Sequence, residues 1–197
     1  MHKHYLIISF GLLLLCGCNG SNQSNSGAST STPKPALVAG TVKSTLDSNG
    51  TVLLVKMLNN YYALKNSMVA TDSAKARETA LNLKTATVNM QDYLKSDTLN
   101  MGKLHPFLYT IIAQSDAITT TVDKTCERQR IFFGVISNNF FALMKNTDIK
   151  NAGIYKEHCP MAFNEKGADW LSDDPDIKNP YFGKKMLECG EVTDSIK

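Results

Sequence analysis

The sequence predicts a mainly α protein, an up-down four-helix bundle followed by an irregular C-terminal tail that contains short strands. Three observations lead to this prediction. Apolar residues recur at steps of three or four between residues 51 and 144, capping and turn residues divide that stretch into helices, and proline and glycine interrupt the chain after Asn146. Roughly 150 residues follow Leu46, which is enough for one domain with its own core.

The first two helices are predicted from an apolar face and a capping residue. The first is expected to begin near Thr51, with Leu54 and Leu58 on its apolar face. Asp72 then ends a short turn and can serve as the N-cap of a second helix that begins at Ser73.

A break is expected at residues 97–106, because Gly102 and Pro106 both interrupt helices. Residues 106–122 and 123–144 then form the third and fourth helices, either as separate elements or as one bent element. The apolar face of the fourth helix, which we expect in the bundle core, consists of Cys126, Phe133, Ile136, Phe140 and Leu143.

The tail, residues 153–192, is expected to form short strands and turns that fold onto one end or side of the bundle. A strand is expected to begin near Gly153, and proline and glycine recur throughout the segment. Trp170, Tyr181 and Phe182 are expected to form a small core that holds the tail to the bundle.

The first 17 residues, 1–17, have the pattern of a lipoprotein signal peptide. Lys3 gives a positive start, and residues 6–15 form an apolar run shorter than the roughly 20 residues that span a bilayer but typical of a secretory signal. The sequence LCGC at 15–18 resembles the site that lipoprotein signal peptidase cuts, so we expect cleavage before Cys18 and lipidation of Cys18. The alternative is an ordinary cleaved signal with a spare cysteine.

This reading divides the chain into a signal peptide, a linker and one domain. Residues 18–45 form the lipidated cysteine and a polar, flexible spacer, and residues 46–197 form a single domain with the tail at its end. The protein is then exported to the cell envelope and held by lipid at the outer membrane, facing the periplasm.

Composition argues against two classes of function. The formal net charge is +3, and it falls to +2 when Lys3 leaves with the signal, so no basic surface for nucleic acid is expected. The sequence contains neither a glycine-rich phosphate loop nor a Gly-x-Ser-x-Gly motif, and no acid/base arrangement is recognisable. We therefore expect no enzyme.

Soft metal donors gather in the tail. His158, Cys159 and Met161 lie within four residues, and Met186 and Cys189 lie three apart further along the chain. Thiolate and thioether sulfurs are the ligands that Cu(I) prefers, and Ag(I) follows by the same softness. If the first segment is a strand, His158 and Cys159 point to opposite faces, so the two need not share one site. Zinc is less suited, because thioethers bind it poorly.

A disulfide between Cys159 and Cys189 is the structural alternative. Unpaired thiols are uncommon in oxidising compartments, and Cys126 is expected to be an ordinary core residue. Closing a loop of about 30 residues contributes roughly 3–4 kcal/mol in the chain-entropy description. Metal binding and the disulfide need not exclude each other, since an exposed disulfide can be reversible.

Five segments together resemble the family called domain of unknown function 3347. They are YYALKN at 61–66, VATD at 69–72, Arg130 with Phe133, HCPMA at 158–162 and NPYFGKKMLECG at 179–190. The resemblance extends from about Leu53 to Val192, and the two tail motifs are its specific part. It implies an exported protein with a heavy-metal role, because the same domain also occurs fused to adaptor subunits of copper and silver efflux pumps. On that pattern Cys159, Met161, Met186 and Cys189 are the candidate ligands.

The sequence predicts a periplasm-facing lipoprotein that binds a soft metal ion, with Cu(I) expected in preference to Ag(I). It would buffer the metal or hand it to an efflux adaptor subunit. The alternative is a structural or interaction module of the envelope, with a Cys159–Cys189 disulfide and no metal.

Overall fold

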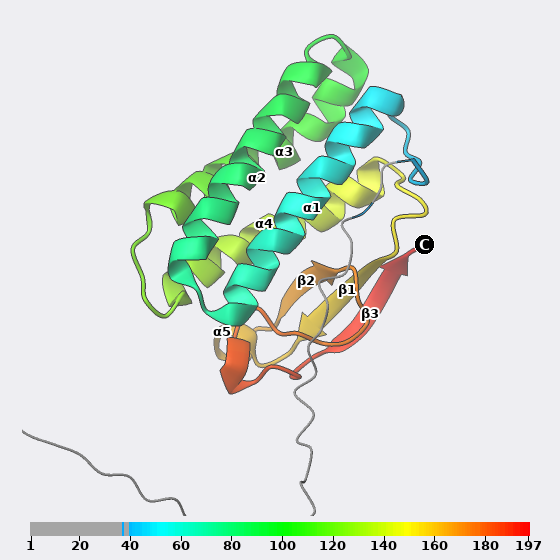
Figure 1. Ribbon diagram of the computed structural model, residues 1–197. Helices are drawn as coiled ribbons and strands as arrows, with labels where there is room; N and C mark the ends of the chain where they lie inside the picture. The colour runs from blue at the N-terminus through cyan, green and yellow to red at the C-terminus, as the bar shows by residue number, and fades with distance from the viewer. Residues whose placement is uncertain (1–36, 38–39) are drawn as a thin grey trace, which may run out of the picture. The chain divides into compact units, whose positions relative to one another are not determined.

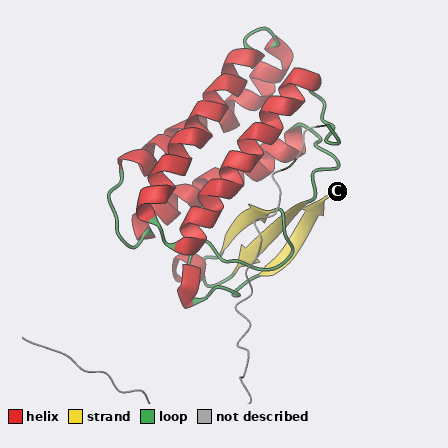
Figure 2. Cartoon of the chain, in the orientation of Figure 1, coloured by secondary structure: helices red, strands yellow, loops and turns green. Residues whose placement is uncertain are grey.

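Four long helices and a three-stranded sheet make up the folded part of the chain in the computed structural model, which describes residue 37 and residues 40–197 (Figures 1 and 2). The helices are α1 Ser48–Ala70, α2 Ser73–Leu94, α3 Thr98–Thr120 and α4 Glu127–Asn146. Consecutive helices pack against each other in an up-down order, and the predicted fold class is confirmed. The predicted signal peptide and Cys18 lie outside the described residues.

An aspartate caps each of the first three helices. In each case the carboxylate accepts a hydrogen bond from the backbone amide three residues on, which satisfies a helix donor that would otherwise lack a partner. The pairs are Asp47 with Gly50 at 2.8 Å, Asp72 with Lys75 at 2.9 Å and Asp97 with Asn100 at 3.1 Å. The predicted start of α2 at Ser73 is confirmed.

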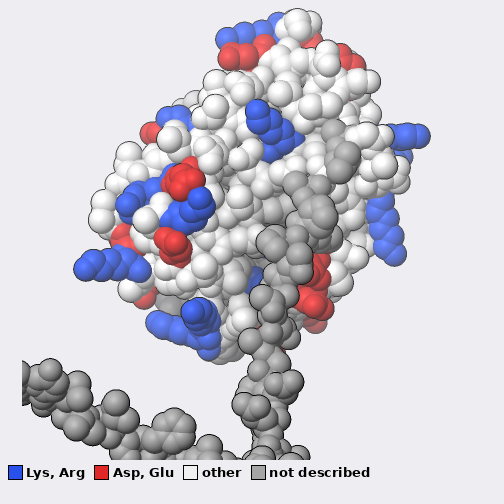
Figure 3. All heavy atoms as spheres, in the orientation of Figure 1, with Lys and Arg blue, Asp and Glu red and all other residues white. Residues whose placement is uncertain are grey.

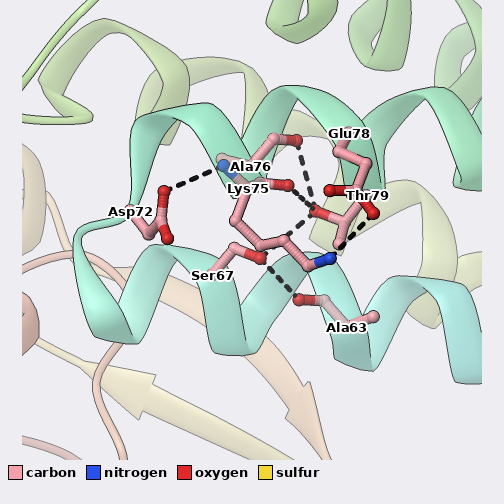
Figure 4. A network of polar contacts seen from close by, with 7 residues as sticks. All are labelled: Ala63, Ser67, Asp72, Lys75, Ala76, Glu78 and Thr79. Carbon is pink, nitrogen blue, oxygen red and sulfur yellow. Dashed lines mark hydrogen bonds and ion pairs between the residues drawn. The ribbon is translucent and has the colours of Figure 1, made fainter.

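The turn between α1 and α2 is further tied by side-chain hydroxyls (Figure 4). The Ser67 hydroxyl of α1 lies 3.3 Å from the Thr79 hydroxyl of α2. Each hydroxyl also lies 2.9 Å from a carbonyl of its own helix, Ser67 from Ala63 and Thr79 from Lys75, so one can donate across the turn while the other donates to its own helix. These bonds hold two buried polar groups in register where the helices turn back on each other.

The predicted break at residues 97–106 is wrong, because α3 runs through both Gly102 and Pro106. Proline cannot donate to the carbonyl four residues earlier, which here belongs to Gly102. Gly102 is exposed, so water can solvate the carbonyl that proline leaves without a partner. The cap at Asp97 fixes the start of the helix before either residue is reached.

Helices α3 and α4 are separate, and the question left open by the sequence is decided by the loop between them. Asp123, the predicted start of the fourth helix, lies in this loop, where its carboxylate accepts from the amides of Thr125 at 3.0 Å and Arg128 at 2.7 Å. Helix α4 begins after Cys126, whose φ of 61° is left-handed. The residues of its predicted apolar face are all buried.

The sheet has the order β2–β1–β3 and is antiparallel throughout, with β1 Ile154–Cys159, β2 Ala168–Ser172 and β3 Glu191–Ile196. Tyr61 joins it to the bundle: its hydroxyl accepts the amide of Leu171 at 3.0 Å and lies 2.8 Å from the hydroxyl of Ser137 on α4. The Tyr61 ring packs on Phe133 and Phe140, with centroids 5.5 and 4.7 Å away. One side chain of α1 thereby contacts both α4 and the outer strand.

Residues before α1 already pack on the domain. The amide of Lys43 donates to the carbonyl of Lys150 at 3.1 Å, and the reverse bond is 2.8 Å long. The backbone of Leu37 exchanges two hydrogen bonds with the side chain of Asn59. The folded unit therefore reaches back beyond Leu46, where the sequence predicted the domain to begin.

Arg130 of α4 connects the bundle to the tail. Its buried guanidinium donates to the carbonyls of Pro180 at 2.7 Å, Thr125 at 2.7 Å and Met68 at 3.0 Å. Gly183 lies beside it with a φ of +56°, and a Cβ there would come within 2.5 Å of the Thr71 hydroxyl and 2.9 Å of the Val69 carbonyl. The tail therefore packs this closely on the end of α1 because position 183 carries no side chain.

We expect Arg130→Lys to lower the free energy of unfolding by about 2–4 kcal/mol, because a lysine amine cannot serve the separate carbonyls that the planar guanidinium reaches. Urea denaturation of the variant measures this loss. Exposed Arg128 provides the matched control, and Arg128→Lys should change stability by less than about 0.5 kcal/mol. Equal effects of the two substitutions would contradict the structural role of Arg130.

Candidate functional site

Cys159 and Cys189 converge on one face of the sheet. Cys159 is the last residue of β1 and is fully buried, whereas Cys189 precedes β3 and is half-buried. Their Sγ atoms are 3.1 Å apart, and both are free thiols. The sequence placed these two residues in one candidate site, and the fold brings their sulfurs into contact.

The two thiols are positioned by hydrogen bonds rather than by a covalent link. Pairing of β1 with β2 places Cys159 opposite Ala168. Buried Asn179 holds Cys189: its side-chain amide donates to the Cys189 carbonyl at 2.7 Å, and its backbone amide donates to the Leu187 carbonyl at 2.7 Å. Residues 179–189 therefore form a loop whose ends meet at Asn179.

Aromatic side chains lie beside the segment that carries Cys189. Trp170 on β2, the only tryptophan in the sequence, lies edge-on to Tyr181, with ring centroids 5.9 Å apart. A Cβ added to Gly190, the neighbour of Cys189, would come within 2.9 Å of the Trp170 ring. Tyr181 also packs on Phe133 of α4 at 5.8 Å, so the predicted small core of the tail continues into the bundle.

The surroundings of Cys189 and Cys126 raise the pKa of each of these thiols. The neighbouring Cys159 thiol raises the pKa of Cys189 above its usual value, because the contact between the two thiols favours the protonated form of Cys189. Burial raises the pKa of Cys126, and this third thiol lies at the start of α4, in the bundle core.

His158 faces away from the thiol pair. It precedes Cys159 in β1, so its side chain lies on the opposite face of the sheet. There its Nδ1 is 2.6 Å from Oδ1 of Asp169, while Lys156 approaches the other carboxylate oxygen at 2.8 Å. Asp169 therefore contacts His158 on the face of the sheet opposite to the Cys159 side chain.

The two candidate methionines flank the pair along the chain. Met186 is half-buried and begins the turn that ends at Cys189, whose amide donates to the Met186 carbonyl at 3.2 Å. Met161 follows Cys159 by two residues and is 46% exposed. After it the chain enters a left-handed turn at Phe163 and Asn164, with φ values of 53° and 58°. Both thioethers thus belong to segments that carry one of the thiols.

Apart from His158, the candidate metal ligands in the described residues are sulfur atoms, which are soft donors. Within residues 37 and 40–197, no group of three or more histidine, cysteine, aspartate or glutamate side chains is arranged to hold a metal ion. Two sulfurs that share a metal ion lie roughly 4 Å apart, given metal–sulfur bonds of about 2.3 Å, and disulfide sulfurs lie about 2.0 Å apart. The 3.1 Å separation falls between these arrangements, so a small movement reaches either one.

A buried charged cluster lies on the same face of β1, two residues before Cys159. Lys65 of α1 is 2% exposed and donates to the Ser172 hydroxyl at 3.1 Å. Glu157 is fully buried, and Trp170 and Ser172 lie close enough to its carboxylate to lower its pKa, although neither makes a hydrogen bond of good geometry. Burial raises the pKa of Glu157 to about 7, and burial lowers the pKa of Lys65. In both cases burial disfavours the charged form, because the group has been removed from water.

Sequence reasoning missed Asn179, Lys65 and Glu157. Only the position of Asn179 between two turn-forming stretches could have drawn attention to it, because side-chain amides often organise turns. Lys65 and Glu157 gave no signal, since charged residues in an amphipathic pattern are normally exposed.

On the face shown in Figure 3, basic and acidic side chains are interspersed, and no patch of a single charge stands out. Two clefts of about 480 and 260 Å³ open beside α4, and both are lined by Ile131 and Phe163 but not by the thiols. In the part of the chain that the structure covers, no helix has the length and apolar character needed to cross a bilayer.

A comparison with protein families matches residues 57–152 to the family described as Protein of unknown function (DUF3347). The resemblance noted from the sequence is confirmed over this segment. The match covers most of the helical bundle and ends before β1, so it includes neither thiol of the pair. No curated protein and no solved structure matches the chain.

We expect the folded chain to lose stability as the pH rises from about 4.5 to about 7, because the folded state keeps the Glu157 proton that the unfolded state releases. The loss from this residue approaches about 3 kcal/mol above that window. Urea denaturation across this pH range should show a flatter profile for Glu157→Gln, with a larger relative gain at pH 8 than at pH 5. An unchanged profile would contradict a buried, titrating Glu157.

Proposed function

We propose that this chain, which belongs to the DUF3347 family through residues 57–152, is a lipid-anchored envelope protein that binds a soft metal ion, Cu(I) before Ag(I). The observation that carries the proposal is the convergence of Cys159 and Cys189, whose sulfurs lie 3.1 Å apart. The metal is a cargo that the protein buffers or passes on, and an efflux adaptor subunit is the proposed recipient.

The chemistry of the donors supports Cu(I) over harder ions. Cu(I) is bound well by thiolate and thioether ligands, and carboxylate oxygens suit Mg²⁺, Ca²⁺ and Mn²⁺ instead. Cys159 and Cys189 would supply the thiolates, and Met186 and Met161 are the thioethers on the same two segments. His158 is left out, because its ring lies on the other face and is engaged by Asp169.

Burial supports a buffering or transfer role. Cys159 is screened from solvent and Cys189 is partly open, so a metal ion would enter at Cys189. A site with one accessible sulfur lets a partner's ligand attack the metal stepwise while the buried sulfur still holds it. The loop closed by Asn179 fixes Cys189, and the pairing of β1 with β2 fixes Cys159, so both thiols are placed before the ion arrives and the ordering cost of binding is reduced.

We expect the reduced full chain, with Cys16→Ser and Cys18→Ser, to retain one Cu(I) against a chromophoric competitor. Cys159→Ser and Cys189→Ser should each abolish retention, because the remaining thiol lacks its partner. Met186→Leu should weaken affinity by roughly 10- to 100-fold, the range seen when a supporting group at a metal site is lost. Competition titration followed by the chelator's absorbance measures all four proteins.

Two substitutions serve as controls for that titration. Cys126→Ala removes a core thiol, and His158→Gln removes the imidazole on the opposite face, so both should retain Cu(I) as the parent chain does. Failure of the reduced parent to retain copper, or an equal loss in Cys126→Ala, would overturn the proposal. A disulfide-bonded chain that binds no copper even after reduction would favour the structural module.

Lipid anchoring has its own test. Cys18→Ala should abolish incorporation of labelled palmitate and release the chain from the membrane fraction, because the acylated residue is gone. Cys16→Ala is the matched control, and it should leave both readouts unchanged, since bulky Leu15 precedes Cys16 whereas small Gly17 precedes Cys18. Palmitate label retained in Cys18→Ala would contradict the anchor.

A further inference from the structure

We infer that Cys159 and Cys189 are a reversible thiol–disulfide pair in the folded protein, with Cys189 exchanging with an external disulfide and Cys159 resolving the intermediate. The inference concerns the redox chemistry of the pair and goes beyond metal binding. One consequence rests on the proposed function: the disulfide form has no thiolate left to bind Cu(I), so oxidation closes the metal site.

The first support is that the tail holds its shape without a covalent bond between the cysteines. Asn179 uses its backbone and side chain to fix the carbonyls of Leu187 and Cys189, and its Oδ1 accepts the amides of Tyr181 at 2.8 Å and Phe182 at 3.3 Å. Strand pairing fixes Cys159 separately. A disulfide is therefore not required to keep this loop closed, so reduction should not unfold it.

The second support is the distance between the sulfurs. At 3.1 Å they must approach by only about 1 Å to reach the length of a disulfide bond. Both backbones are already fixed, so the second thiol is present at a high effective concentration. The intramolecular bond should form before a second external thiol can intervene.

The third support is the difference in exposure, which sets the order of the steps. Of the two thiols in the pair, Cys189 is open to solvent and Cys159 is fully buried. Thiol–disulfide exchange depends on access to the attacked or attacking sulfur. An external reagent therefore reaches Cys189 first, and Cys159 reacts only with the sulfur of Cys189.

The steps balance with an external disulfide, RSSR, as the oxidant. The Cys189 thiolate attacks one sulfur of RSSR, which forms a mixed disulfide and releases one RS⁻. The Cys159 thiolate then attacks the Cys189 sulfur, which forms the intramolecular disulfide and releases the second RS⁻. The two protons of the pair end on the released thiols, and the two electrons reduce RSSR to two RSH. Reduction by RSH retraces these steps.

The test is exchange with oxidised glutathione in the full chain carrying Cys16→Ser and Cys18→Ser. After acid quenching and alkylation, peptide mapping should show an intramolecular Cys159–Cys189 disulfide, reversed by reduced glutathione with unchanged circular dichroism. Emission from Trp170, whose ring lies beside Gly190, should follow the rate. Cys126 should remain a free thiol and serves as the internal control.

Two variants separate the roles of the sulfurs. Cys159→Ser should accumulate a glutathione adduct on Cys189, because the resolving thiol is missing. Cys189→Ser should leave Cys159 free, with an adduct rate at least ten times lower. Equal rates in the two variants would overturn the assigned order, and a disulfide that can be reduced only in denaturant would overturn reversibility in the folded protein.

A copper measurement on the same samples links the pair to the metal site. The reduced chain should retain Cu(I), and the oxidised chain should not until it is reduced again. Equal retention by both forms would overturn closure of the site by oxidation. If neither form retains copper, the proposed function fails, and the exchange results still decide whether the pair is reversible.

Discussion

The hydrogen bonds of the Arg130 guanidinium fix the position of the tail on the bundle. The guanidinium satisfies carbonyls at the end of α1, in the loop before α4 and at Pro180, and buried carbonyls without partners would be costly. Pro180 is joined to Asn179, which in turn holds Cys189. The position of the more exposed thiol therefore traces back, bond by bond, to one charged side chain on a helix.

Much of the helical part could be predicted from local chemistry. Asp72 marked the start of α2 because a short carboxylate before a helical pattern satisfies a free amide, and that interaction needs no distant partner. The buried face of α4 followed from its periodicity. The two tail cysteines were paired as candidates from their residue types, and their contact depends on the sheet, which the sequence indicated only as short strands.

The errors and omissions involve long-range effects. Proline usually interrupts a helix, yet α3 continues through Pro106 because Gly102, whose carbonyl loses its donor, is an exposed residue that water can reach. Exposure of this kind is a property of the assembled bundle. Lys65 and Glu157 lie within patterns that are read as solvent-facing, and their burial follows from how α1 meets β1. Asn179 organises its loop through bonds to residues 181–189, none of which its local sequence specifies.

The hydroxyl of Tyr61 also bears on how copies of this protein behave at high local concentration. An outer strand with free amides can template pairing with another molecule and start a fibril. On β2 the amide of Leu171 is already taken by Tyr61, and α4 packs against that strand. The opposite edge, β3, carries Glu191 and Asp194, and a register shift interrupts its pairing with β1. Tyr61 and α4 cover the β2 edge, and charged side chains lie on the β3 edge, so the native sheet resists pairing with strands of other molecules at both edges.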